Sequence, residues 1–339
     1  MPLAAPANKQ GRIAADNIMG AKKIYKGSRA ASVVKMFGCT LAAVGVNEGG
    51  LRAKGLVKDR DYRSIIITQN HHAGYYPGAE PMFLKLIFSM DGERILGAQI
   101  IGGNGVDKRI DSIATAMKLG AGVEELEELD LAYSPPYSSA KDPVNMAGFT
   151  AKNVIDGLVS FCDWDEKPDS GSIWLDIREK AETHAFALPG SLHIPAGQLR
   201  ERLAELDKKK KYIIFCTIGV RAYNAARAMA QRGFENVKVY PAGVRFYRTL
   251  FGAQGCKTGS FFEAEPDERI DCRCLGCPAP ASELIAAMDS MKAGEILEAA
   301  VSYPEGIKDA AGWCMDSGNL LLGSKITGNS ALVYIKKHE

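Results

Sequence analysis

The segment FCTIGVRAY, Phe215–Tyr223, combines a cysteine, small residues and an arginine in a spacing that suits nucleophilic chemistry. Cys216 ends the apolar run KYIIF, and a helix is expected to begin near Arg221. Loop N–H groups, the positive end of that helix and the arginine charge would favour a thiolate over a thiol. Gly219 suits a loop that turns tightly. A core cysteine at a strand end fits the same spacing, so the spacing alone leaves both roles open.

A second group of thiols occurs in DCRCLGCPAPASELIAAM, where Cys272, Cys274 and Cys277 fall within six residues. Pro278 suits the first position of a helix. Cys277 would then lie at a helix N-terminus, which favours a thiolate. A structural zinc needs four ligands, usually as two pairs, and no second pair is apparent, so no metal site is expected. A disulfide involving Cys277 stays open as a redox switch.

The bulk composition bounds the class of protein. The chain has 339 residues, 46% apolar and 24% charged residues and a net charge of +2, so two or three soluble domains are expected. This charge gives no reason to expect nucleic acid as a partner. The sequence shows neither a membrane span nor a secretory signal. We therefore expect a cytoplasmic protein whose eight cysteines are mostly reduced.

The pattern of elements predicts a multidomain α+β and α/β chain. A strand at 64–68, a hairpin formed by 83–89 and 95–102, and a helix with Val106, Ile110, Ile113 and Met117 on its buried face make the first domain, 1–155. Residues 162–172 look like a linker. Strands and helices then alternate, which predicts a parallel-sheet domain at 165–255. A two-layer sandwich follows at 266–339, where Cys314 shares a helical face with buried residues and is expected to pack.

The middle domain resembles the rhodanese family of sulfurtransferases. The resemblance rests on LDIRE, LPGSLHIP and CTIGVRA, in that order over about 90 residues. It implies that Cys216 carries a persulfide in a six-residue loop, which consists of Cys216, Thr217, Ile218, Gly219, Val220 and Arg221. The resemblance also implies that Asp176 and Arg178 support the base of the loop and that His193 is architectural.

The last domain resembles the TusA-like (SirA-like) sulfur carriers. The match runs from about Ile270 to Lys337 and includes the CPAP cysteine, the KAGEILE run and the WC…G…LL pattern. The resemblance implies that Cys277 accepts and carries sulfur.

The first domain resembles the dimerisation domain of pyridine-nucleotide disulfide oxidoreductases of the CoA-disulfide reductase and NADH-dependent persulfide reductase type. PLAAPANKQGRIAADNI, YYPGAEPMFLKLIF and LDLAYSPPYSSAKDPVNMAG carry the resemblance. It implies a homodimer in which tyrosines reach the partner's active site. By motif position these are Tyr75 and Tyr133, with Tyr76 and Tyr137 as alternatives. The adjacent His71 and His72 are expected at the surface.

Complete members of that family use FAD, NADH and CoA, but the sequence here lacks a G-x-G-x-x-G fingerprint for a dinucleotide. The resemblance implies only a remnant of the FAD domain at 1–20. Within it, Pro2, Leu3 and Ala4 would form part of the edge of a flavin-binding site. The chain is therefore expected to be a truncated or split form that holds no cofactor alone.

These patterns predict sulfane-sulfur transfer. Thiosulfate or a small persulfide would load Cys216, and the sulfur would pass to Cys277 or to a small thiol such as CoA. A separate flavoprotein would supply reductase activity. Two alternatives stay open, a dimerising carrier or scaffold module without turnover and a thiol redox sensor.

Overall fold

The computed structural model describes residues 3–168, 171–251, 265–273, 275, 279–302, 305–328 and 330–338. The chain divides into two compact units. The first comprises Met1–Ile65, Leu84–Asp130 and Pro143–Ile155, and the second comprises Ile66–Phe83, Leu131–Asp142 and Asp156–Glu339. No helix among the described residues combines the length and the apolar character that crossing a membrane requires.

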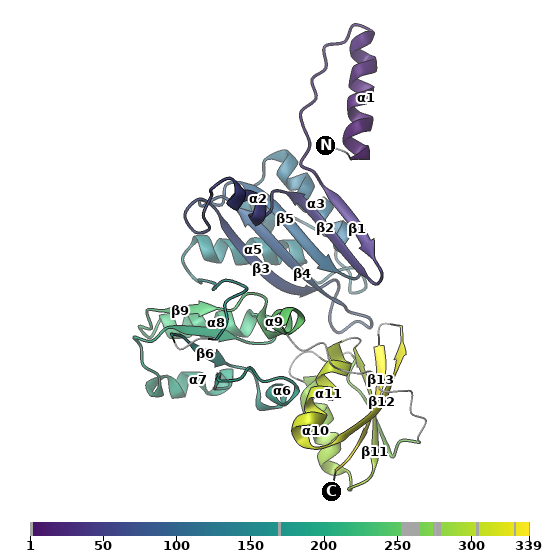
Figure 1. Cartoon of the computed structure of the whole chain (residues 1–339), viewed down its shortest axis with the longest axis vertical. Helices are drawn as coiled ribbons and strands as arrows, with labels where there is room; N and C mark the ends of the chain where they lie inside the picture. The colour runs from purple at the N-terminus through teal and green to yellow at the C-terminus, as the bar shows by residue number, and fades with distance from the viewer. Residues whose placement is uncertain are drawn as a thin grey trace. The chain divides into compact units, whose positions relative to one another are not determined.

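The N-terminal sheet has the strand order β1-β2-β5-β4-β3. Its strands are β1 (Ser32–Met36), β2 (Cys39–Gly45), β3 (Arg63–Asn70), β4 (Pro81–Phe88) and β5 (Ile95–Gly102). The helices of this region are α1 (Ala4–Ile18), α2 (Glu48–Ala53), α3 (Val106–Leu119), α4 (Val123–Glu128) and α5 (Pro143–Ile155). Figure 1 shows α3 and α5 along one face of this sheet.

Helix α3 packs on the sheet as its apolar periodicity predicts. Val106, Ile110, Ile113 and Met117, four residues on one helical face, are all buried. The predicted strand at 64–68 and the hairpin formed by β4 and β5 are also present. The core of this region is therefore readable from the sequence, because each element buries the face that its periodicity marks.

The middle domain contains a parallel sheet of order β7-β6-β8-β9. Its strands are β6 (Ile173–Asp176), β7 (Leu192–His193), β8 (Tyr212–Phe215) and β9 (Val237–Val239). Its helices are α6 (Lys180–Ala185), α7 (Ala196–Arg202), the 3-10 turn η1 (Leu203–Glu205), α8 (Val220–Ala230) and α9 (Gly243–Phe251). The predicted alternation of strands and helices is confirmed, with α6, β7 and α9 as additional elements.

The predicted linker at 162–172 is wrong for its first residues. The Cys162 N–H donates to the Val239 carbonyl, and the Tyr240 hydroxyl donates to the Trp164 carbonyl at 2.7 Å. Cys162 is buried. The polar, acidic composition of the segment suggested a linker, whereas its backbone groups bond to the edge strand of the sheet.

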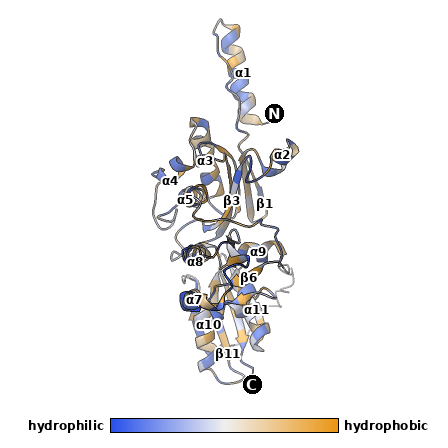
Figure 2. Cartoon of the chain, turned by 90° about the vertical axis from the view of Figure 1, so that its left-hand side faces the viewer, coloured by the Kyte–Doolittle hydropathy of each residue, from blue (hydrophilic) through white to orange (hydrophobic). Residues whose placement is uncertain are grey.

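The C-terminal domain is a two-layer α/β sandwich with the sheet order β10-β11-β13-β12. Its strands are β10 (Glu268–Asp271), β11 (Ile296–Ser302), β12 (Leu320–Thr327) and β13 (Ser330–Lys336), and its helices are α10 (Ala279–Ser290) and α11 (Glu305–Ser317). Leu284, Met288 and Met291 join one apolar core. Figure 2 shows hydrophobic residues on β11, where Leu297 and Ala299 are fully buried. The expected multidomain organisation is confirmed.

Candidate functional site

The cysteine loop joins the end of β8 to the start of α8. Cys216 directly follows the buried strand, and Gly219 adopts a φ of +111°, a left-handed conformation that side chains disfavour. This turn directs the Gly219 N–H to the Cys216 Sγ at 3.1 Å. Helix α8 then begins at Val220. The geometry supports the expectation that loop N–H groups and a helix N-terminus stabilise negative charge on this sulfur.

The start of helix α9 packs directly on the same loop. Gly243 has a φ of +72°, and a Cβ at this position would lie 2.5 Å from the Thr217 carbonyl oxygen and 2.6 Å from the Ile218 nitrogen. The following N–H groups satisfy loop carbonyls: Val244 donates to Cys216 at 2.8 Å and Arg245 to Thr217 at 3.1 Å. A glycine is therefore required here for close backbone approach.

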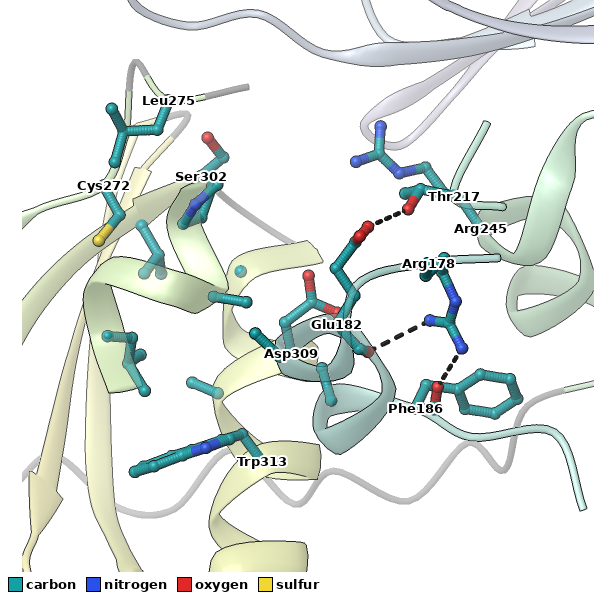
Figure 3. A pocket seen from close by; sticks show the side chains of 18 of the residues that line it. Arg178, Glu182, Phe186, Thr217, Arg245, Cys272, Leu275, Ser302, Asp309 and Trp313 are labelled. Atoms are coloured by element: carbon teal, nitrogen blue, oxygen red, sulfur yellow. Dashed lines mark hydrogen bonds between the residues drawn. The ribbon is translucent and has the colours of Figure 1, made fainter. Parts of the chain in front are cut away.

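Glu182 of helix α6 holds two residues of the loop. Its carboxylate accepts two hydrogen bonds from the Arg221 guanidinium, both at 2.7 Å, and one from the Thr217 hydroxyl at 2.5 Å. Figure 3 shows the contact with Thr217. Burial raises the pKa of Glu182, but the hydrogen bonds from Arg221 and Thr217 outweigh it, so its pKa lies below the usual range.

This ion pair changes the expected role of Arg221. The sequence suggested that Arg221 adds a full charge beside the sulfur, and the structure pairs that charge with a carboxylate. Arg221 therefore braces the loop through Glu182 and Thr217. The hydrogen bond that reaches the Cys216 sulfur comes instead from the Gly219 N–H, directly before α8.

Asp176 and Arg178 support the base of the site. Their ion pair is almost fully buried, with 2.6 Å between Nη2 and Oδ2. Arg178 also donates to the carbonyls of Glu182 and Phe186, as Figure 3 shows, and His193 Nε2 lies 2.8 Å from the Arg178 carbonyl. Because Asp176 pairs in register with Phe215, this cluster anchors α6 beside the loop.

A cavity of about 510 Å³ lies at the loop. Its lining includes Asn70, Ser139, Cys216, Arg221, Arg245 and Arg273. The guanidinium of Arg245 forms no hydrogen bond or ion pair within the part of the chain that the structure describes. The cavity thus offers a nucleophile and an available cation to an anionic ligand.

The hydroxyl groups of Tyr75 and Tyr133 lie 2.9 Å apart. Both side chains are exposed, and the hydrogen bond from Tyr75 raises the pKa of Tyr133. Gly74, next to Tyr75 in the sequence, lines the cavity at Cys216. Ser139, six residues after Tyr133, lines the same cavity. The structure thus brings the two tyrosines together, and their catalytic role stays a prediction.

The expectation that His71 and His72 are surface residues is wrong for His72, which is 4% exposed. Its ring contacts the Tyr76 ring edge-on, and Nδ1 lies 3.0 Å from the Ala73 carbonyl. The Ala73 N–H bonds to the carbonyls of Pro135 and Ser138, so a distant segment covers the imidazole. A polar dipeptide gives no sign of such coverage.

Several predicted residues lie outside the described part of the chain, namely Pro2, Cys274 and Cys277. Leu3 and Ala4 lie at the start of α1, where Pro6 is the buried residue. These few residues do not by themselves form a site that fits FAD. Cys272 and Cys314 are buried, which raises their pKa values to about 11 and about 12. Such shifts fit packing for Cys314.

The sequence reasoning missed Glu182, Gly243 and Arg245. The signal for Gly243 was a proline and a glycine close together between strand β9 and helix α9, which Gly243 begins. Glu182 and Arg245 carried no distinguishing local pattern. Their importance follows from contacts with a loop that is distant in the sequence.

Three family models match successive parts of the chain. The dimerisation domain of pyridine nucleotide-disulphide oxidoreductases matches residues 31–143, the rhodanese-like domain matches 163–248, and the sulfurtransferase TusA matches 268–337. The chain therefore contains a disulfide-oxidoreductase dimerisation domain, a rhodanese-like domain and a TusA domain. The three resemblances seen in the sequence are confirmed.

Curated proteins and solved structures match longer stretches of the chain. A coenzyme A disulfide reductase of Staphylococcus aureus is 41% identical over 153 residues, which are 45% of this chain and 34% of that protein. The crystal structure of reduced Bacillus anthracis CoADR-RHD matches with 44% identity and a TM-score of 0.69, over 74% of this chain and 45% of that one. A NAD-dependent persulfide reductase from A. fulgidus matches with 37% identity and a TM-score of 0.66, over 73% of this chain and 44% of that one. The chain thus spans about a third of the curated relative and less than half of these structures.

Proposed function

We propose that the chain transfers sulfane sulfur, with Cys216 as the carrying residue, within a persulfide- or CoA-disulfide-reducing system. One observation carries the proposal: Cys216 Sγ accepts the Gly219 N–H and lines a cavity that also presents Arg245. A donor can thus enter beside a sulfur whose surroundings favour negative charge. The rhodanese-like and TusA domains and the two kinds of reductase relative support the same chemistry.

In the loading step, the Cys216 thiolate attacks the outer sulfur of thiosulfate or of a small persulfide. The new S–S bond forms as the bond to the leaving group breaks, and sulfite or a thiolate departs with the electron pair. The sulfur on Cys216 is then a persulfide anion. The Gly219 N–H and the start of α8 stabilise it, while Glu182 and Arg221 keep the loop in shape.

In the unloading step, a second thiolate attacks the outer sulfur and Cys216 leaves as a thiolate. The proposed acceptor is Cys277 or a small thiol such as CoA. Reduction of the product would require a separate flavoprotein that uses FAD and NADH, and Tyr75 and Tyr133 would contribute to its site across a homodimer. Exposed apolar residues on and beside β1, among them Val33, Val34 and Phe37, support such a dimer.

The test is the mass of the purified chain after treatment with thiosulfate or glutathione persulfide, followed by peptide mapping. We expect the mass of one added sulfur atom on Cys216, lost on treatment with cyanide and absent from a Cys216→Ser variant. Absence of any adduct on Cys216 in the unaltered chain would contradict the proposal and favour a carrier or scaffold without turnover.

A further inference from the structure

Helix α6 contacts two different partners. Through Glu182 it holds Thr217 and Arg221 of the cysteine loop. It also contacts helices α10 and α11 of the TusA domain. The same short helix therefore touches both the residues that shape the persulfide loop and the sulfur-carrier domain.

Gly312 permits the contact between α6 and α11. A Cβ at position 312 would lie 2.0 Å from the Ala185 carbonyl oxygen and 2.9 Å from the Ala185 carbonyl carbon. These are backbone atoms, which cannot move aside as a flexible side chain would. A glycine inside a helix is less stable than alanine by roughly 0.5–1 kcal/mol. The close approach of α6 gives a physical reason for a glycine in the middle of α11.

One ion pair and one further side-chain contact flank this contact. Arg248 of α9 pairs with Asp309 of α11, and His184 of α6 lies within hydrogen-bonding distance of Asp316. The Arg248 guanidinium also lies 5.5 Å from the centre of the Phe186 ring. Partly exposed ion pairs contribute little free energy, but they select one orientation of the two surfaces.

The contact brings a segment of the TusA domain to the Cys216 cavity. A pocket of about 160 Å³ has Phe186, Thr217 and Arg245 on one side and Cys272, Leu275 and Trp313 on the other, as Figure 3 shows. Arg273, Leu275 and Ser302 also line the cavity that contains Cys216. Leu275 lines both spaces and precedes Cys277 by two residues in the sequence.

We propose that α6 is the docking site for the TusA domain of the same chain, and that Gly312 permits this docking so that sulfur passes within one chain. The inference rests on the proposed function of Cys216. The Cys216 persulfide anion takes up a proton from solvent, a carrier thiolate attacks its outer sulfur, the old S–S bond breaks, and the protonated outer sulfur stays on the carrier. Cys216 leaves as a thiolate, and no external oxidant or reductant is consumed.

The first experiment compares Gly312→Val with Gly197→Val in the full chain. Gly197 is an exposed residue of α7, and a Cβ added there would have no neighbouring atom within 4 Å, so its variant controls for valine in a helix. Each chain is loaded with thiosulfate, and the excess donor is then removed. Samples are quenched at intervals, and the added sulfur is mapped on the peptides that contain Cys216 and Cys277. The covalent link between the two domains already holds the acceptor at an effective concentration of about the millimolar range, so the test of docking is the rate of transfer.

We expect transfer in the unaltered chain and in Gly197→Val at a rate independent of protein concentration. In Gly312→Val the transfer should slow by at least about tenfold while it stays independent of protein concentration, with loading of Cys216 retained. Transfer at the unaltered rate in Gly312→Val would overturn the inference. A lack of loading in the unaltered chain would instead overturn the proposed function.

A second experiment does not depend on sulfur chemistry. Hydrogen exchange of the peptide that covers Lys180–Ala185 should be faster in Gly312→Val and in Arg248→Asp than in the unaltered chain. Adding Asp309→Arg to Arg248→Asp restores the opposite charges and should restore protection. Unchanged exchange in both single variants would show that α6 is not a docking site.

Discussion

Cys216 and Cys162 are equally buried, at 1% exposure each, yet their surroundings differ. Cys216 receives an N–H from Gly219 and lines a cavity. Cys162 lies in an apolar cluster with Trp174 and Tyr240, where burial, reinforced by the Glu166 carboxylate, raises its pKa to about 12. Burial alone therefore does not distinguish an inert thiol from a nucleophile. Backbone donors and access to a ligand do.

The largest expected effect separates these two cysteines. Cys216→Ser should reduce sulfur transfer from thiosulfate to cyanide by at least about 10³-fold, because serine cannot form the persulfide. Cys162→Ala should leave the rate intact because its thiol lines only the core. Comparable losses in the two variants would contradict the distinction between them.

The next effect concerns the carboxylate that braces the loop. Glu182→Gln should lower the rate about 10- to 100-fold and destabilise the fold by about 2–4 kcal/mol, because it leaves the Arg221 guanidinium without its anionic partner. The exposed Glu201 provides a control, and Glu201→Gln should change neither quantity. Rates and urea denaturation midpoints check both expectations.

The same ion pair predicts a pH dependence. Because the pKa of Glu182 is lowered in the folded state, its contribution is present above the unfolded-state pKa of roughly 4.3. It is lost as the pH falls through the lower folded-state value. The difference in unfolding free energy between the unaltered chain and Glu182→Gln should therefore shrink as the pH falls below about 4. A constant difference down to pH 3 would argue against an ionised carboxylate here.

A smaller effect tests the available cation in the cavity. Arg245→Gln should raise KM for thiosulfate about tenfold with kcat little changed, since a charge-assisted hydrogen bond to the donor is lost. Arg245→Lys should keep most of the affinity. Arg200→Gln, at an exposed position of α7, is the matched control. Equal KM values for Arg245→Gln and Arg200→Gln would remove Arg245 from donor recognition.

The last prediction is a change in stability at alkaline pH. The pKa values of Cys162 and Cys314 are raised to about 12, so both thiols stay neutral in the folded chain where unfolded thiols ionise. The contribution of these thiols to the free energy of unfolding is complete below roughly pH 8.5. It should fall by about 1.4 kcal/mol per pH unit per thiol up to about pH 12. In Cys162→Ala the unfolding free energy should fall less steeply with pH, by the contribution of one thiol. An unchanged slope would contradict the raised pKa of Cys162.

Much of the framework could be predicted before the structure. The strand–loop–helix around Cys216 follows from an apolar run, a glycine and an amphipathic helix, all of which are local signals. The buried faces of α3 and α10 follow from periodicity in the same way. The sequence did not predict the burial of His72 or the hydrogen bond from the Cys162 N–H to the Val239 carbonyl. Both depend on contacts with segments that are distant in the sequence.

The sequence by itself determined the element that carries each motif, because strands, loops and helices depend on neighbouring residues and on short-range periodicity. The three kinds of domain were recognised from motifs that resemble known families. Only the tertiary structure decided that Glu182, which is 39 residues from Arg221, neutralises that charge. It alone decided that Gly243 supports the loop and that Gly312 meets Ala185. These contacts join segments that have no local signal for one another, so packing selects them rather than propensity.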